Sequence, residues 1–131
     1  MNIETNHLTA LGNKVDNALT WEQLETFDAP PLVKTVSFET HEVSALCPVT
    51  NQPDLYSVTI TYQPDGQCVE SKTLKLYLMQ FRNRGIFGEG IADIICNDLS
   101  LALTPKWIEV VAVQQIRGGL RMTTTAVRGN A

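Results

Sequence analysis

The chain has 131 residues, of which 44% are hydrophobic and 18% charged, so it holds enough apolar material for one folded domain and does not read as disordered. The formal net charge of −4 argues against a protein that binds a nucleic-acid backbone, because such proteins usually carry a basic surplus. No apolar run approaches the roughly 20 residues of a membrane span, and the N-terminus lacks the basic and apolar segments of a secretory signal. We therefore expect a cytoplasmic protein with no membrane segment.

The first half of the chain reads as an arm followed by two strands. Residues 1–32 are predicted to be an N-terminal arm that lies on a single domain formed by residues 33–131. The β-forming residues at 33–39 predict a first strand. At 55–63, apolar residues alternate with serine and threonine, which predicts a half-buried strand. A Pro-Asp-Gly turn follows it at 64–66.

The second half changes to a helical period and then returns to strands. Apolar residues at helical spacing predict one helix over 70–84 and a second over 88–103. The run at 107–116 is rich in β-formers, and 120–128 is predicted as the last strand. The Arg-Gly-Gly sequence at 117–119 is typical of a turn between them.

The order of elements is strand, strand, helix, helix, strand, strand. It predicts an α+β sandwich, in which an antiparallel four-stranded sheet carries two helices on one face. Such a sheet has two open edges, and residues 35–39 or 122–127 at an edge would invite pairing with another chain. A closed ring of subunits removes those edges, so we expect a homo-oligomer.

The connection between the first two strands is predicted to span about 15 residues, 40–54, whereas a hairpin needs only about 2 to 5. This connection contains Cys47 and Asp54, with Pro48 and Pro53 restricting its backbone. An ionised cysteine is a good nucleophile, and a nearby carboxylic acid can protonate the atom that gains charge. A lone cysteine is more often a small buried residue, and an aspartate in a turn is more often a cap. On the pair alone both interpretations stay open.

The remaining cysteines and the histidines show no metal pattern. Cys68 and Cys96 are far from Cys47 and from each other, and no CxxC pair is present. His7 and His41 do not complete a zinc motif. We therefore expect neither a structural disulfide nor a bound metal.

Several motifs carry a resemblance to a known family. The sequences CPVTNQPD at 47–54 and VESKTLKLY at 69–77 resemble the QueF family, the NADPH-dependent 7-cyano-7-deazaguanine (preQ0) reductases. The sequences LGNK at 11–14, FRNRGIFGE at 81–89 and RGG at 117–119 match that family in order and spacing. The resemblance implies the tunnelling fold (T-fold), in which pentamers close a barrel, often stack into decamers, and form active sites where subunits meet.

The resemblance also implies a reaction, the reduction of a nitrile to a primary amine in the pathway to the queuosine base. Cys47 would attack the nitrile carbon to give a covalent thioimide, and Asp54 would protonate the nitrogen. NADPH would then deliver hydride twice. Shielding of the imine from water would prevent its hydrolysis.

Further site residues follow from the resemblance. Glu89 matches the carboxylate that holds the purine-like ring, although a glutamate at a helix start also suits the helix dipole by itself. The implied substrate contacts are Val69, Glu70, Ser71, Gly88 and Glu89. The implied cofactor contacts are Ser71, Lys72, Arg117 and Gly118, where cations suit a polyanion, although a lysine on a helix is also an ordinary solvated residue. No GxGxxG motif is present, so a dinucleotide-binding fold is not expected.

One position departs from the family pattern, because Gly88 stands where the family usually has a histidine before the ring-binding glutamate. Three outcomes are open: a slower reductase in which another group such as His41 substitutes, an amidine-forming transferase acting on a nucleotide, or a non-catalytic binder of 7-deazapurines. The acidic charge disfavours nucleic acid as the substrate, and retention of Cys47 and Asp54 disfavours a mere binder. We expect the reductase.

Overall fold

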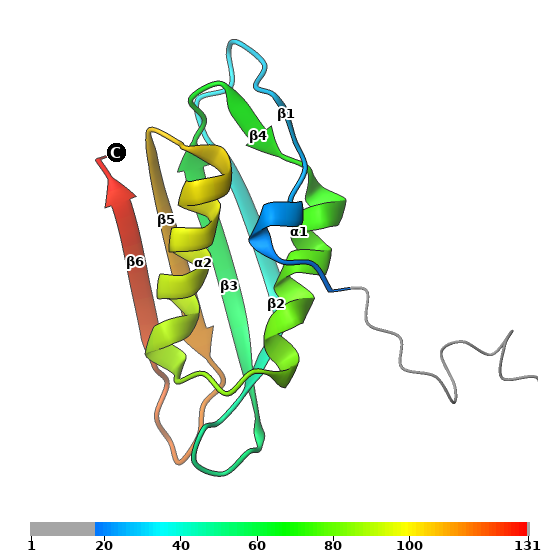
Figure 1. The fold of residues 1–131 in the computed structure, drawn as a ribbon. Coiled ribbons are helices and arrows are strands. Elements are labelled where there is room, and N and C mark those ends of the chain that lie inside the picture. Colours follow the sequence, from blue (N-terminus) through cyan, green and yellow to red (C-terminus); the bar gives the residue numbers. More distant parts are fainter. Residues whose placement is uncertain (1–17, 131) are drawn as a thin grey trace, which may run out of the picture.

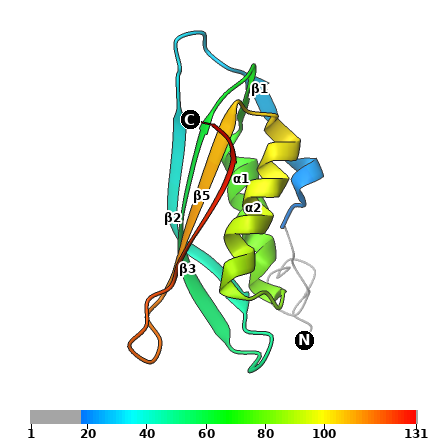
Figure 2. The same cartoon turned by 90° about the vertical axis from the view of Figure 1, so that its left-hand side faces the viewer.

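The structure, a computed structural model, describes residues 18–130, so the matching segment at 11–14 and His7 lie outside the described residues. Its main sheet is antiparallel in the order β2-β3-β5-β6 (Figure 1). The strands are β2 (Val36–Leu46), β3 (Pro53–Gln63), β5 (Trp107–Gln114) and β6 (Thr123–Gly129). The helices α1 (Ser71–Leu78) and α2 (Gly88–Leu103) both cover the same face of this sheet, as Figure 2 shows.

The core lies between the sheet and the helices. Alternate residues of β3 point toward the helices and are at most 4% exposed, and β5 alternates in the same way. They meet apolar residues that recur at helical spacing on α2, which explains why these segments form the elements that the period predicts. The buried residues of β3 and α2 in this layer are Tyr56, Val58, Ile60, Tyr62, Ile91, Ile95 and Leu99.

The predicted 15-residue connection is wrong, because the first strand is longer than 33–39. Strand β2 continues to Leu46, and the hairpin loop spans only residues 47–52. The register shifts between Thr40 and Val43, so His41 and Glu42 share one place in the ladder opposite β3. This bulge interrupts the alternation of apolar and polar residues at the place where polar residues gather in the sequence. Cys47 therefore follows a strand directly.

Other boundaries shift by a few residues. The predicted helix over 70–84 is α1 followed by a 3₁₀ helix, η2 (Met79–Asn83), whereas α2 begins and ends at the predicted residues. Strand β5 ends at Gln114, and the last strand begins at Thr123. Its predicted start at Leu120 is wrong because Arg117 and Leu120 bond to each other across a turn.

A second, two-stranded sheet was not predicted. Strand β1 (Thr26–Asp28) pairs antiparallel with β4 (Gln67–Val69), just after the 3₁₀ helix η1 (Trp21–Gln23). Strands of three residues are too short for alternation to reveal them. Within residues 18–130, no helix combines the length and the apolar character needed to cross a bilayer.

Candidate active site

The candidate site lies at one end of the main sheet, where β2 ends, β3 and α2 begin, and β5 turns toward β6 (lower end in Figure 1). The backbone ties these parts together. The Leu46 N–H donates to the Arg84 carbonyl at 2.9 Å, and the Ile86 N–H donates to the Leu46 carbonyl at 3.0 Å. The segment that leads into α2 is therefore held against the residue before Cys47.

Cys47 sits in a closed turn with its sulfur accessible. Its N–H donates to the Gln52 carbonyl and its carbonyl accepts from the Asn51 N–H, each at 2.8 Å, with Asn51 at a φ of 60°. The Cys47 side chain is partly exposed. A hydrogen bond from the Thr50 hydroxyl, then the N–H groups of Thr50 and Val49, lower the pKa of the Cys47 thiol. The loop thus favours a thiolate that solutes can reach.

Asp54 pairs with a cation on the neighbouring loop. It is the second residue of β3 and only 4% exposed, and its Oδ1 accepts a hydrogen bond from Arg117 Nη1 at 2.5 Å. The Arg117 side chain is 54% exposed, so it presents a charged surface to solvent as well. Gly118 and Gly119 follow at φ of 58° and 81°, which a two-residue hairpin turn of this hand requires. The predicted residues Asp54, Arg117 and Gly118 are therefore brought together.

The start of α2 lies at the same end. Glu89 is exposed in the first turn of α2, and no side chain caps that helix start. Gly88 is buried, and a Cβ added to it would collide with the Cε methyl of Met122. The Met122 methyl group therefore occupies the space that a side chain at residue 88 would need.

Comparison with known proteins identifies the family. The family model described as "QueF-like protein" matches residues 53–131. A protein from Anaeromyxobacter sp. (strain K), named NADPH-dependent 7-cyano-7-deazaguanine reductase, is 44% identical over 108 residues, which cover 81% of this chain and 88% of that protein. The chain belongs to the QueF-like family.

Two further proteins with the same name are also similar to this chain. One from Syntrophus aciditrophicus (strain SB) is 40% identical over 125 residues, covering 94% of this chain and 87% of its own. One from Bacteroides fragilis is 44% identical over 117 residues, covering 86% and 78%. A crystal structure of the archaeosine synthase QueF-Like in the apo form superposes with a TM-score of 0.71 at 21% identity, over 79% of this chain and 98% of that one. This likeness confirms the predicted fold class.

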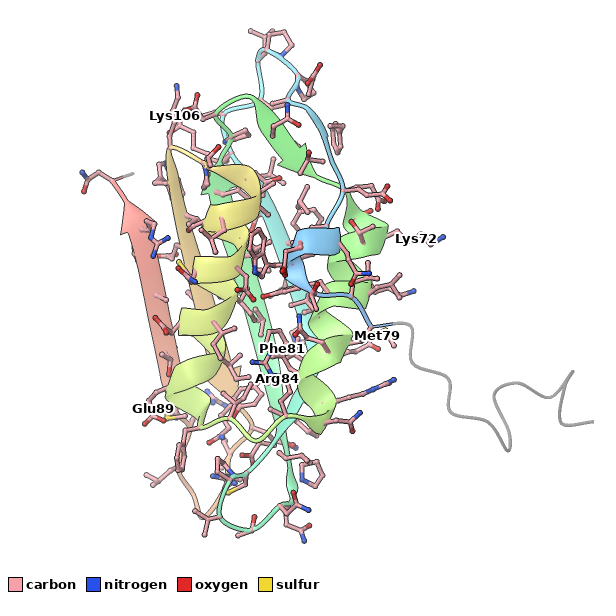
Figure 3. The ribbon with its side chains drawn as sticks, viewed as in Figure 1. Lys72, Met79, Phe81, Arg84, Glu89 and Lys106 are labelled. Atoms are coloured by element: carbon pink, nitrogen blue, oxygen red, sulfur yellow. The ribbon has the colours of Figure 1, made fainter. Side chains whose placement is uncertain are left out.

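Four of the predicted site residues lie away from this end of the subunit. The Val69 N–H donates to Tyr62 Oη at 3.0 Å, and Tyr62 lies eight residues beyond Asp54 on β3, so Val69 is roughly 25 Å from Asp54. Ser71 and Lys72 begin α1 next to it, and Figure 3 shows Lys72 at the right of the molecule about mid-height, away from Glu89 at the lower left. One subunit by itself does not bring Val69, Glu70, Ser71 and Lys72 to Cys47.

Glu70 has a structural task in this subunit. Its carboxylate accepts the N–H groups of Lys72 and Thr73, each at 2.8 Å, and so caps the start of α1. These two hydrogen bonds lower the pKa of Glu70.

Three polar residues at the Cys47 end were not anticipated from the sequence. Thr50 supports the Cys47 sulfur, and Gln114 Nε2 donates to Tyr56 Oη at 3.1 Å in the buried layer. The sequence does carry signals for Tyr56 and Gln114. Tyr56 shares a strand face with Asp54 at a spacing of two, and Gln114 is a polar residue at an inward position of an apolar strand. Nothing distinguishes Thr50 from any other threonine in a turn.

Proposed function

We propose that this protein reduces the nitrile of 7-cyano-7-deazaguanine to the aminomethyl group, with NADPH as the hydride source. The observation that carries the proposal is the 44% identity, over 81% of the chain, to a protein of that name. The partly exposed Cys47 and the buried Asp54, whose charge acts on the Cys47 thiol, support it, because the reaction needs a nucleophile and a proton donor at one place.

The chemistry begins at the Cys47 sulfur. Its lowered pKa increases the thiolate fraction at neutral pH, and a thiolate can add to the electrophilic carbon of a nitrile. A C–S bond forms, one C–N π bond breaks, and the nitrogen takes up a proton from Asp54. The product is a thioimide, which accepts hydride more readily than a free nitrile.

Arg117 and Glu89 have separate tasks in this proposal. Arg117 hydrogen-bonds Asp54 Oδ1 and so positions the carboxyl group, and being 54% exposed it can also meet an anionic cofactor group. Glu89 is exposed at the start of α2, where its carboxylate can accept two N–H groups from a guanine-like edge. The ring would thereby be held with its nitrile directed toward Cys47.

NADPH supplies hydride when bound, and the predicted cofactor residues fit a polyanion. Lys72 and Ser71 are exposed at the start of α1, and Arg117 and Gly118 are exposed on the loop between β5 and β6. These residues suit the cofactor only if two subunits contribute to one site. The same holds for the substrate contacts Val69, Glu70 and Ser71, on one side, and Gly88 and Glu89, on the other. We therefore propose a homo-oligomer, of the ring type that the family resemblance implies, with the site between subunits.

Two measurements test the proposal. Purified protein given 7-cyano-7-deazaguanine and NADPH should oxidise the NADPH and yield the aminomethyl product, identified by its mass. Without NADPH, intact-mass spectrometry should show an increase equal to the mass of the nitrile. Cys47→Ala should lose this adduct, whereas the control Cys96→Ala, a buried cysteine of α2, should retain it.

Each negative result has a distinct meaning. Failure to oxidise NADPH and to form the aminomethyl product would exclude the reductase. Product that forms only with ammonia and without NADPH would indicate an amidine-forming enzyme. An adduct that persists in Cys47→Ala would remove Cys47 as the nucleophile.

A further inference from the structure

The Tyr56 hydroxyl is a buried polar group beside the proposed site that the chemistry above does not use. Tyr56 lies two residues after Asp54 on β3, so both side chains point to the helix-covered face. The Tyr56 side chain is 2% exposed. Its oxygen accepts the hydrogen bond from Gln114 Nε2, which occupies a lone pair and leaves the hydroxyl proton uncommitted.

This hydroxyl faces the start of α2. A Cβ added to Gly88 would lie 3.4 Å from Tyr56 Oη and 3.4 Å from Gln114 Nε2, so the pair points at the backbone just before Glu89. The Met122 methyl lies in the space between. Met122 is a flexible side chain with three rotatable bonds, and its movement would open a space between Gly88 and the Tyr56 hydroxyl.

The surroundings keep the proton on Tyr56. Burial raises the pKa of Tyr56, Gln114 opposes that effect, and the charges of Asp54, Arg117 and Glu89 all act on the hydroxyl. These charged groups are the ones assigned above to the proton donor, its partner and the ring. Tyr56 is therefore a hydrogen-bond donor throughout the neutral range and lies among the residues of the proposed site.

The reaction requires a second proton. When the thiolate adds to the nitrile, the nitrogen takes up one proton, which Asp54 supplies. When hydride reaches the thioimide carbon, the remaining C–N π bond breaks and the nitrogen takes up another. The C–S bond then breaks, sulfur leaves with its electron pair, and the iminium carbon accepts the second hydride. Two hydrides and two protons thus convert the nitrile to the amine.

We propose that the Tyr56 hydroxyl donates the second proton, the one taken up by nitrogen at the first hydride transfer, and regains it from solvent. This role rests on the proposed reductase function. Asp54, once it has given its proton, is held as a carboxylate by Arg117, and Tyr56 is the neutral acid nearest to it along the same strand face. Gly88 provides the room for this donor, because a side chain there would contact the hydroxyl.

The variant Tyr56→Phe separates the two proton transfers. We expect it to form the covalent adduct at the rate of the unmodified protein and to lower the kcat of NADPH oxidation about 100-fold, as loss of a general acid does. Asp54→Asn should instead lose adduct formation. The matched control Tyr77→Phe removes another buried tyrosine hydroxyl, which donates to Asp98 Oδ2 at 2.6 Å between the helices, and should leave both steps unchanged.

Tyr56→Phe leaves Gln114 Nε2 without its hydrogen-bond acceptor, which could destabilise the fold. The double variant Tyr56→Phe/Gln114→Leu removes both partners and serves as the second test of the proposal. The proposal is overturned if either well-folded variant oxidises NADPH within threefold of the unmodified protein, or if adduct formation falls as far as kcat does. If the unmodified protein itself shows neither adduct nor NADPH oxidation, the reductase function fails instead.

Discussion

Cys47 is made reactive by the turn that follows it. The Thr50 hydroxyl has the largest effect on the Cys47 pKa, followed by the N–H groups of Thr50 and Val49, and all of them favour the thiolate. Partial burial and the charge of Asp54 oppose them without reversing the direction. A six-residue loop between two strands is enough to hold these donors around one sulfur.

Removing the Thr50 hydroxyl should therefore make Cys47 less reactive at neutral pH. In the unmodified protein, the rate of Cys47 alkylation by iodoacetamide should rise with pH around a midpoint below that of an ordinary thiol. In Thr50→Val the midpoint should move to higher pH, because the hydrogen bond that stabilises the thiolate is lost. Peptide mapping separates Cys47 from the buried Cys68 and Cys96, which should react slowly in both proteins. An unchanged midpoint would contradict this assignment.

The two helices begin in different ways, and the difference relates to their proposed tasks. Helix α1 has its first N–H groups satisfied by Glu70, which fixes the backbone around Ser71 and Lys72. Helix α2 begins at Gly88 with no side-chain cap, its Gly90 N–H donates to the Phe87 carbonyl at 2.8 Å, and its positive dipole end lies beside Glu89. One helix start is thus fixed by a side-chain cap, and the other carries no such cap.

Glu70 should stabilise the fold in a pH-dependent way. Because its pKa in the folded protein is lowered, its contribution is present above the ordinary glutamate pKa of about 4.3 and disappears as pH falls through the lowered value. At pH 7, Glu70→Ala should lower Tm by about 2–5 °C, a usual effect of losing a helix cap in a domain of this size. The difference from the unmodified protein should shrink in acid. Thermal unfolding followed by circular dichroism measures Tm, and Glu39→Ala, at an exposed glutamate, is the control. If the Tm difference between Glu70→Ala and the unmodified protein stays constant as the pH is lowered, the cap does not depend on an ionised Glu70.

At the scale of the whole molecule, the sheet has the two open edges that the sequence predicts, β2 and β6. A groove of about 550 Å³ runs between β2 and α1, so that edge is not closed by the subunit's own helix. The predicted site residues are split between two places on one subunit, with Val69 roughly 25 Å from Asp54. A ring in which β2 of one subunit pairs with β6 of the next would cover both open edges. It would also allow the separated site residues of two subunits to meet at the subunit interface.

Mixing two inactive variants tests a site shared between subunits. Cys47→Ala lacks the nucleophile, and the charge reversal Lys72→Glu should impair the proposed cofactor contact. If the two residues act from different subunits, refolding an equal mixture should restore about a quarter of the activity, since that share of the interfaces pairs an intact Cys47 with an intact Lys72. Activity no higher than that of the parents would show that both residues serve the same subunit's site. Size-exclusion chromatography with light scattering gives the ring size in parallel.

The elements that could be predicted are those whose signal is local. The period of α2 reveals its full extent because Ile91, Ile95 and Leu99 face one core, and β3 shows its alternation from Tyr56 onward. The length of β2 could not be predicted, because the bulge at His41 and Glu42 breaks the alternation and is stabilised by pairing with a distant strand. The pair of three-residue strands was missed for the same reason, since each exists only through its partner.

The sequence by itself determined the fold class, the family and the proposed chemistry of Cys47 with Asp54, because residue type and spacing along one segment carry that information. Tertiary structure alone decided that Arg117 meets Asp54 from 63 positions away and that Met122 fills the space beside Gly88. It alone placed the Tyr56 hydroxyl and Gln114 against the start of α2. Such contacts join segments far apart in the chain, and they form only when the packed core has fixed where each segment lies.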